Sequence, residues 1–131
     1  ALRGSSELKK AGLWAFAAAA FLALPAYYSG EGAEEVVEHL PGVLESIIHR
    51  HEEAAEKSLI AVLLLGAGAL GSVGWSWKTG ADSGRSALTC LVLSFPVMAL
   101  LAWAAHLGGM VRHTEIHDGA ATASVSDRDT D

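Results

Sequence analysis

Charged side chains are missing from three long stretches of this 131-residue sequence. Residues 11–28, 58–77 and 86–111 contain no Asp, Glu, Lys or Arg. At about 1.5 Å per residue, each is long enough to cross a hydrocarbon core of roughly 30 Å. Three such helices in so short a chain would leave a soluble domain too little polar surface to cover them. The sequence therefore predicts an all-α integral membrane bundle with three transmembrane helices.

Basic residues and cysteine are also scarce. The nine Lys and Arg residues form no stripe. This excludes nucleic acid as a partner, because most of the affinity for nucleic acid comes from basic side chains that neutralise phosphates and release counterions. The single cysteine, Cys90, lies in the third stretch, where it makes no intramolecular disulfide and reads as a small packing residue. Glycine patterns that bind phosphate or dinucleotides are absent too. We expect no independent catalytic activity, and the uncharged spans disfavour a transport pathway.

The connection between the first two spans is acidic, and it is not a random linker. Eight glutamates lie between Ser29 and Lys57, and apolar residues recur there at three- and four-residue intervals, as in an amphipathic helix. We expect Ser29, Gly30 and Gly32 to end the first helix. Residues 33–56 are then an amphipathic interfacial helix, interrupted at Pro41–Gly42 and continuing into the second span.

Small residues in the second span predict close helix packing. Ala67 with Gly71, and Gly68 with Ser72, are small-xxx-small pairs, which let two helix backbones touch in a membrane. Pro96 is expected to kink the third span, with Ser94 satisfying freed backbone groups. The membrane domain then covers residues 1–118, and the acidic tail 119–131 has a composition that predicts disorder.

Orientation follows from the distribution of basic residues. Five lie on the side of the N-terminus and four on the opposite side, but the inner segments are shorter and the other side carries a surplus of acid. The positive-inside rule then predicts a cytoplasmic N-terminus and an outer C-terminus. The basic residues on the predicted inner side are Arg3, Lys9, Lys10, Lys78 and Arg85.

All six histidines fall on the predicted outer side or at its edge. His51 precedes the second span by seven residues, and His113 follows His106 by seven. On antiparallel helices His51 and His113 would both stand about 10 Å above the membrane edge. Neutral imidazole binds haem iron or copper, and Glu52 is a further candidate ligand. The alternative is that these histidines are interfacial side chains that hydrogen-bond nearby glutamates.

Several short motifs resemble one family. They are Leu24-Pro25-Ala26-Tyr27, the run Ser29–Glu38, Leu40-Pro41-Gly42-Val43, His51-Glu52-Glu53-Ala54-Ala55, His106-Leu107-Gly108-Gly109 and the run Arg112–Ile116. In this order, over residues 6–116, they resemble the small bacterial membrane proteins classified as domain of unknown function 2231.

The resemblance implies four spans, the first opening with an Asn-His-Pro-type motif. That helix does not occur in the sequence, and we expect that it was lost or precedes Ala1. It also implies a bacterial inner-membrane location, and its motif histidines match His51, His106 and His113. The family's activity is not established, so the resemblance supplies no reaction.

Two hypotheses about function result. In the first, the chain is a small subunit of a larger, electron-transfer type of membrane complex or of a homo-oligomer, and its thin helices pack against partners within the lipid bilayer. In the second, it is a redox module that binds haem b or copper through His51, His106 and His113 on the outer side. A cofactor site requires His51 and His113 to converge.

Overall fold

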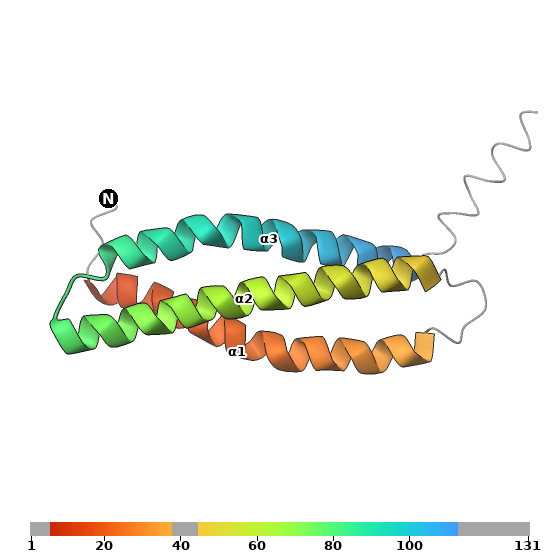
Figure 1. Ribbon diagram of the computed structural model, residues 1–131, viewed down its shortest axis with the longest axis horizontal. Coiled ribbons are helices and arrows are strands. Elements are labelled where there is room, and N and C mark those ends of the chain that lie inside the picture. The colour runs from red at the N-terminus through yellow and green to blue at the C-terminus, as the bar shows by residue number, and fades with distance from the viewer. Residues whose placement is uncertain (1–5, 38–44, 113–131) are drawn as a thin grey trace, which may run out of the picture.

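The computed structural model describes residues 6–37 and 45–112. Within these residues the chain forms three helices and no strand: α1 (Ser6–Val37), α2 (Glu45–Thr79) and α3 (Gly84–Arg112). Consecutive helices are antiparallel and lie side by side (Figure 1). Each helix contains a segment long and apolar enough to cross a membrane. The predicted all-helical class and its three candidate membrane spans are thereby confirmed.

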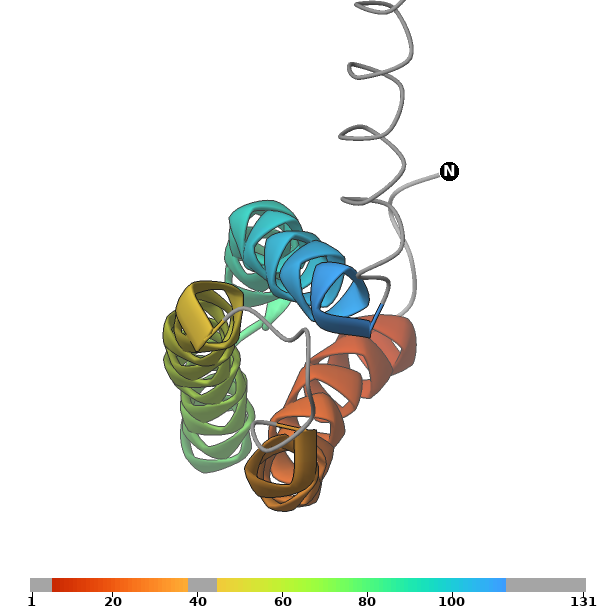
Figure 2. The ribbon, with the colours of Figure 1, turned by 90° about the vertical axis from the view of Figure 1, so that its right-hand side faces the viewer.

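Helix α2 is the centre of the bundle. It packs along both α1 and α3, whereas α1 and α3 touch each other far less. In the end-on view the three helices stand at the corners of a triangle, and the C-terminal end of α1 lies apart from α3 (Figure 2). At the opposite end, Lys9 of α1 forms an ion pair with Asp82 of the α2–α3 turn, with 3.1 Å between Nζ and Oδ1. The N-terminal end of α1 and this turn therefore lie at the same end of the bundle.

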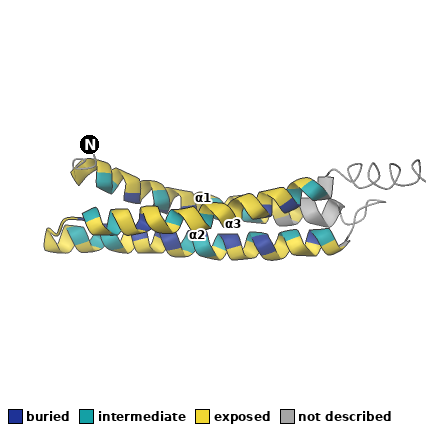
Figure 3. Cartoon of the chain, turned by 90° about the horizontal axis from the view of Figure 1, so that it is seen from above, coloured by how far each residue is buried: buried dark blue, intermediate teal, exposed yellow. Residues whose placement is uncertain are grey.

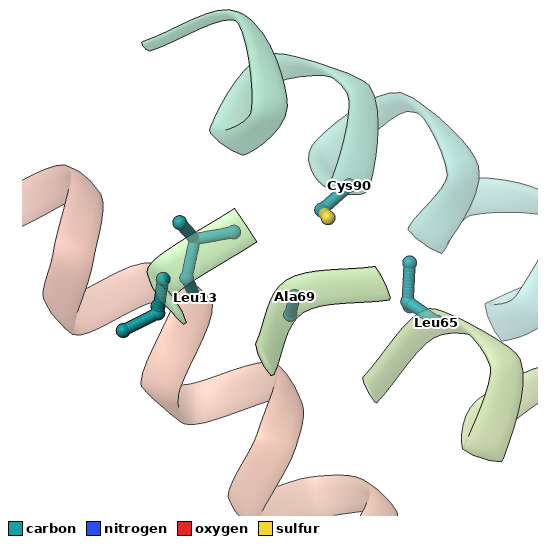
Figure 4. Packing of buried hydrophobic residues seen from close by; sticks show 5 residues of the cluster. Leu13, Leu65, Ala69 and Cys90 are labelled. Carbon is teal, nitrogen blue, oxygen red and sulfur yellow. The ribbon is translucent and has the colours of Figure 1, made fainter. Parts of the chain in front are cut away.

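The core between the three helices is built from small and medium side chains. Leu13 of α1, Leu65 and Ala69 of α2, and Cys90 of α3 are buried against one another together with Val73 (Figure 4). Leu13 and Ala69 have no exposed surface. Small side chains let the helix backbones approach closely. Close packing of this kind stabilises helix association in lipid, where the hydrophobic effect contributes little because the lipid chains are as apolar as the helix surface.

The outer surface of the bundle is apolar. Figure 3 shows that exposed positions dominate the outward faces of all three helices. Large apolar side chains such as Phe21, Leu64 and Phe95 are about 70% exposed, at 72%, 69% and 69% respectively. An apolar surface of this extent is unfavourable in water but suits contact with lipid chains.

The prediction that the first helix ends near Ser29–Gly32 was wrong. Helix α1 continues through these residues to Val37. Glycine inside a helix costs only about 1 kcal/mol relative to alanine, and the Ser29 hydroxyl donates to the carbonyl of Ala26 (2.8 Å) within the same helix. The described residues therefore show no separate amphipathic helix: 33–37 finish α1, and 45–56 begin α2. Pro41, Gly42 and the tail 119–131 lie outside the described residues.

Pro96 lies inside α3. It removes the backbone N–H that would pair with the carbonyl of Val92. The Ser94 hydroxyl donates to the carbonyl of Leu91 (2.7 Å). It therefore does not satisfy the carbonyl of Val92, which Pro96 leaves without its helical N–H partner, and the expectation that Ser94 would do so was wrong.

The turn between α2 and α3 is short and internally bonded. Gly80 has a φ of 67°, and its N–H donates to the carbonyl of Ser76 (2.9 Å), the arrangement of a left-handed helix cap. Ser83 is buried, and its carbonyl accepts the first backbone hydrogen bond of α3, from Ala87 (2.9 Å). This turn fixes where α3 starts beside α2.

Candidate functional site

The first third of α2 extends beyond the predicted span. The helix has 35 residues, which at 1.5 Å each measure about 52 Å against a hydrocarbon core of roughly 30 Å. Its charged residues are confined to the two ends, and the longer charged end runs up to Lys57. This extension packs on the last turns of α3, where Ala54 is buried against Ala104 and Leu107. The extension therefore places its side chains against α3 at the predicted outer end.

His51 lies in this contact. Its ring is partly buried, and Nδ1 is 2.9 Å from the backbone carbonyl oxygen of Ala104. A carbonyl only accepts hydrogen bonds, so Nδ1 carries the proton. In the neutral imidazole Nε2 is then an acceptor with a free lone pair, the tautomer that metal-binding histidines adopt when a carbonyl holds the other nitrogen.

Gly108 makes room for the His51 ring. A Cβ atom at this position would lie 2.9 Å from Cε1 of His51 and 3.4 Å from its Nε2. A side chain on residue 108 would therefore displace the imidazole, so the glycine and the histidine form one packing unit across α2 and α3.

The other predicted ligands are not gathered around His51. His106 is exposed, and its ring lies 6.1 Å from that of Trp103. At 100° per residue it stands about 200° around α3 from Ala104, on another face. Glu52 is exposed and lies 3.6 Å from Nδ1 of His49, which is also exposed. His113 lies outside the described residues.

Within residues 6–37 and 45–112 no group of three or more His, Cys, Asp or Glu side chains could hold a metal ion. The structure thus places one predicted ligand, His51, in a constrained position with an available nitrogen. It does not bring His51 and His106 together.

The small residues of α2 divide into two sets. Gly66 faces α1, and a Cβ atom there would collide with the Cβ of Ala20. By contrast, Gly68 and Gly71 are exposed with no atom within 4 Å of such a Cβ, and Ala67 is exposed as well. Of the four predicted packing residues, Ala67 and Gly71 therefore face outward, Gly68 lines an open groove between α2 and α3, and Ser72 is half-buried in the same groove.

Sequence reasoning missed Gly66 and Gly108 as the glycines that act inside the fold. A signal for Gly66 exists: it sits beside the buried residues of α2, which recur every three or four positions. These are Ala54, Ser58, Val62, Leu65, Ala69 and Val73. For Gly108 the sequence offers only its place in the His106–Gly109 motif.

The class that this fold defines is a helical, multi-pass membrane protein, and its distinguishing features are the His51–Ala104 contact and the open small-residue face of α2. No family model, curated protein or solved structure matches the chain.

Proposed function

We propose that this chain is a small subunit of a larger membrane assembly, and that a transmembrane helix of a partner packs on the outward face of α2. The observation that carries the proposal is the small-residue pair Ala67 and Gly71: both are exposed, and a Cβ atom placed on Gly71 would meet nothing within 4 Å. Small residues in membrane helices permit close backbone approach, and the chain's own helices do not use these two.

The shape of the bundle supports this proposal. Helices α1 and α3 both pack on α2 and touch each other little, so much of each helix remains exposed. Large apolar side chains border the small residues on α2, among them Leu64 and Leu70, which are 69% and 47% exposed. A helix of a partner can therefore approach the α2 backbone most closely along these small residues.

The proposal includes the location and orientation expected from the sequence, an inner bacterial membrane with the N-terminus inside. The acidic extension of α2 would then stand on the outer side, where it meets partners and not anionic lipid. The proposal also keeps the resemblance to domain of unknown function 2231, from which the bacterial location is taken.

A size measurement tests the subunit role. We expect the tagged protein, solubilised from its native membrane in mild detergent, to migrate in blue-native gels as a complex far larger than one 13.6 kDa chain. Replacing Ala67 and Gly71 by leucine blocks the close approach of a partner helix and should release the chain as a free species. The matched control is Ala102→Leu, because Ala102 is an exposed alanine on α3. A free species in the wild type, or equal effects of both variants, contradicts the proposal.

A second function, a haem b or copper module, is favoured by one observation. The Ala104 carbonyl fixes the tautomer of His51 so that Nε2 is available as a ligand. We propose His51 as its anchoring ligand, with His113, or His106 of a second copy, completing the site.

Optical spectra and metal analysis of the purified protein test this module. A reduced-minus-oxidised haem spectrum or stoichiometric copper should be present in wild type and lost in His51→Ala and His113→Ala. His49→Ala is the control, because His49 is exposed and lies beside Glu52. If the purified protein contains neither haem nor copper, the redox module is excluded and only the subunit role remains.

A further inference from the structure

A groove of about 290 Å³ lies between α2 and α3 at the end of the bundle that carries the α2–α3 turn. Arg85 and Ser86 line its mouth, beside Ser72. Leu64 and Leu93 line it farther along the helices, toward the middle of the spans. The groove therefore runs from a cationic, hydroxyl-bearing end to an apolar end, parallel to the helices.

Arg85 is an exposed residue in the first turn of α3, and Lys78 is the cation at the neighbouring end of α2. Arg85 shares the groove with Ser72 of α2. Ser72 precedes Lys78 by six residues, so the groove lies about 9 Å farther from the end of α2 than Lys78 does. Because Arg85 directly precedes the uncharged stretch 86–111, its guanidinium lies at, or reaches, the level of the lipid headgroups, where it can meet a lipid anion.

No acidic side chain of the described residues pairs with Arg85. The two acids at this end of the bundle are already engaged, since Asp82 lies 3.1 Å from Lys9 and Glu7 lies 3.6 Å from Lys10. The exposed guanidinium at this end of the groove is therefore available to an anion from outside the described chain.

The hydroxyls of the groove differ in availability. Ser72 and Thr89 donate to carbonyls of their own helices, those of Gly68 and Arg85. Ser86 makes no such bond within the described residues, so its hydroxyl is free to donate to an oxyanion beside the guanidinium. Phosphate oxygens are the acceptors that a guanidinium and a hydroxyl bind together.

We infer that this groove binds an anionic phospholipid, with the phosphate at Arg85 and Ser86 and the start of an acyl chain along Leu64 and Leu93. Charge complementarity selects the headgroup, and the apolar far end selects a molecule with a hydrocarbon part. The volume is near the lower end of small-molecule sites, roughly 300 Å³, which suits part of a lipid and not a helix. Ala67 and Gly71, which carry the proposed partner contact, do not line the groove.

Native mass spectrometry of the detergent-purified protein tests this inference. With phosphatidylglycerol and phosphatidylcholine of identical acyl chains at equal concentration, wild type should prefer the anionic lipid about fivefold, the effect of one cation near a headgroup. Arg85→Gln should bring this preference close to one. Lys78→Gln removes the same charge at the same end but outside the groove, and should keep the preference.

A second pair of variants tests the apolar part and does not depend on Arg85. Thr89→Phe places a ring in the groove and should lower the binding of both lipids, whereas Leu88→Phe, at a 61% exposed position outside the groove, should not. Far-UV circular dichroism of each variant establishes that the helices are retained.

Four outcomes of the lipid-binding measurements overturn the inference, and two further observations would also contradict it. The four outcomes are an equal affinity of wild type for both lipids, a preference that survives in Arg85→Gln, a preference lost equally in Lys78→Gln, and lipid binding unaffected by Thr89→Phe. Binding of inorganic phosphate as tightly as the anionic lipid would also contradict it, because the site would then recognise the headgroup anion alone. A change of oligomeric state in the groove variants would assign the groove to a protein partner instead.

Discussion

His51 and Gly108 show how one residue without a side chain positions a functional group on another helix. We expect Gly108→Ala to push the imidazole away from the Ala104 carbonyl, since the new Cβ would lie 2.9 Å from Cε1. Losing a partly buried hydrogen bond costs about 1 kcal/mol, which offsets the similar gain in helix propensity from glycine to alanine. Unfolding in SDS, followed by circular dichroism, should show no stabilisation.

Gly109 supplies the comparison for this experiment. It neighbours Gly108 in α3, but a Cβ atom there meets nothing within 4 Å. Gly109→Ala should therefore raise the free energy of unfolding by up to about 1 kcal/mol through helix propensity alone. Equal stabilisation by the two variants would show that the ring adjusts without loss, and would remove Gly108 from the site.

At the scale of the helices, the contact between α1 and α2 depends on Gly66. An added Cβ would collide with that of Ala20 and lie 3.3 Å from the backbone oxygen of Phe16. Backbone cannot move aside as a side chain does, so the two helices must separate. We expect Gly66→Ala to lower the free energy of unfolding by roughly 1–3 kcal/mol, measured in the same SDS titration. Gly74→Ala, which meets nothing within 4 Å, should not destabilise the bundle.

The helices also show which features the sequence predicts and which it does not. The three spans follow from uncharged stretches, because a bilayer imposes a minimum apolar length on any crossing helix. The continuation of α1 through Gly30 and Gly32 does not follow, since glycine weakens a helix by an amount that neighbouring residues outweigh. Likewise, composition singles out the glycines of α2 but not the direction each one faces. Gly66 faces α1, Gly68 lines the groove between α2 and α3, and Gly71 faces outward.

The same limit applies to the candidate site. The clustering of histidines at one end was visible in the sequence, but the partner of His51 was not, because its partner is a backbone carbonyl of α3. Any residue type at position 104 offers that oxygen, so no motif marks it. The two-residue spacing already puts Ala104 and His106 on different faces of α3, but only the structure shows that the face of Ala104 is the one that meets α2.

For the whole molecule, the ion pair between Lys9 and Asp82 places the start of α1 and the α2–α3 turn at one end, and the basic residues there predict that this end is cytoplasmic. We expect a membrane-impermeant maleimide, added to intact spheroplasts of a Cys90→Ala background, to label Ser46→Cys and leave Ala81→Cys unlabelled. Both positions are exposed and neutral, so neither substitution alters the charge balance that sets orientation. Permeabilised cells should label both. Labelling of Ala81→Cys alone in intact spheroplasts would reverse the topology and place His51 and the acidic extension of α2 in the cytoplasm, where an outer-side redox module could not operate.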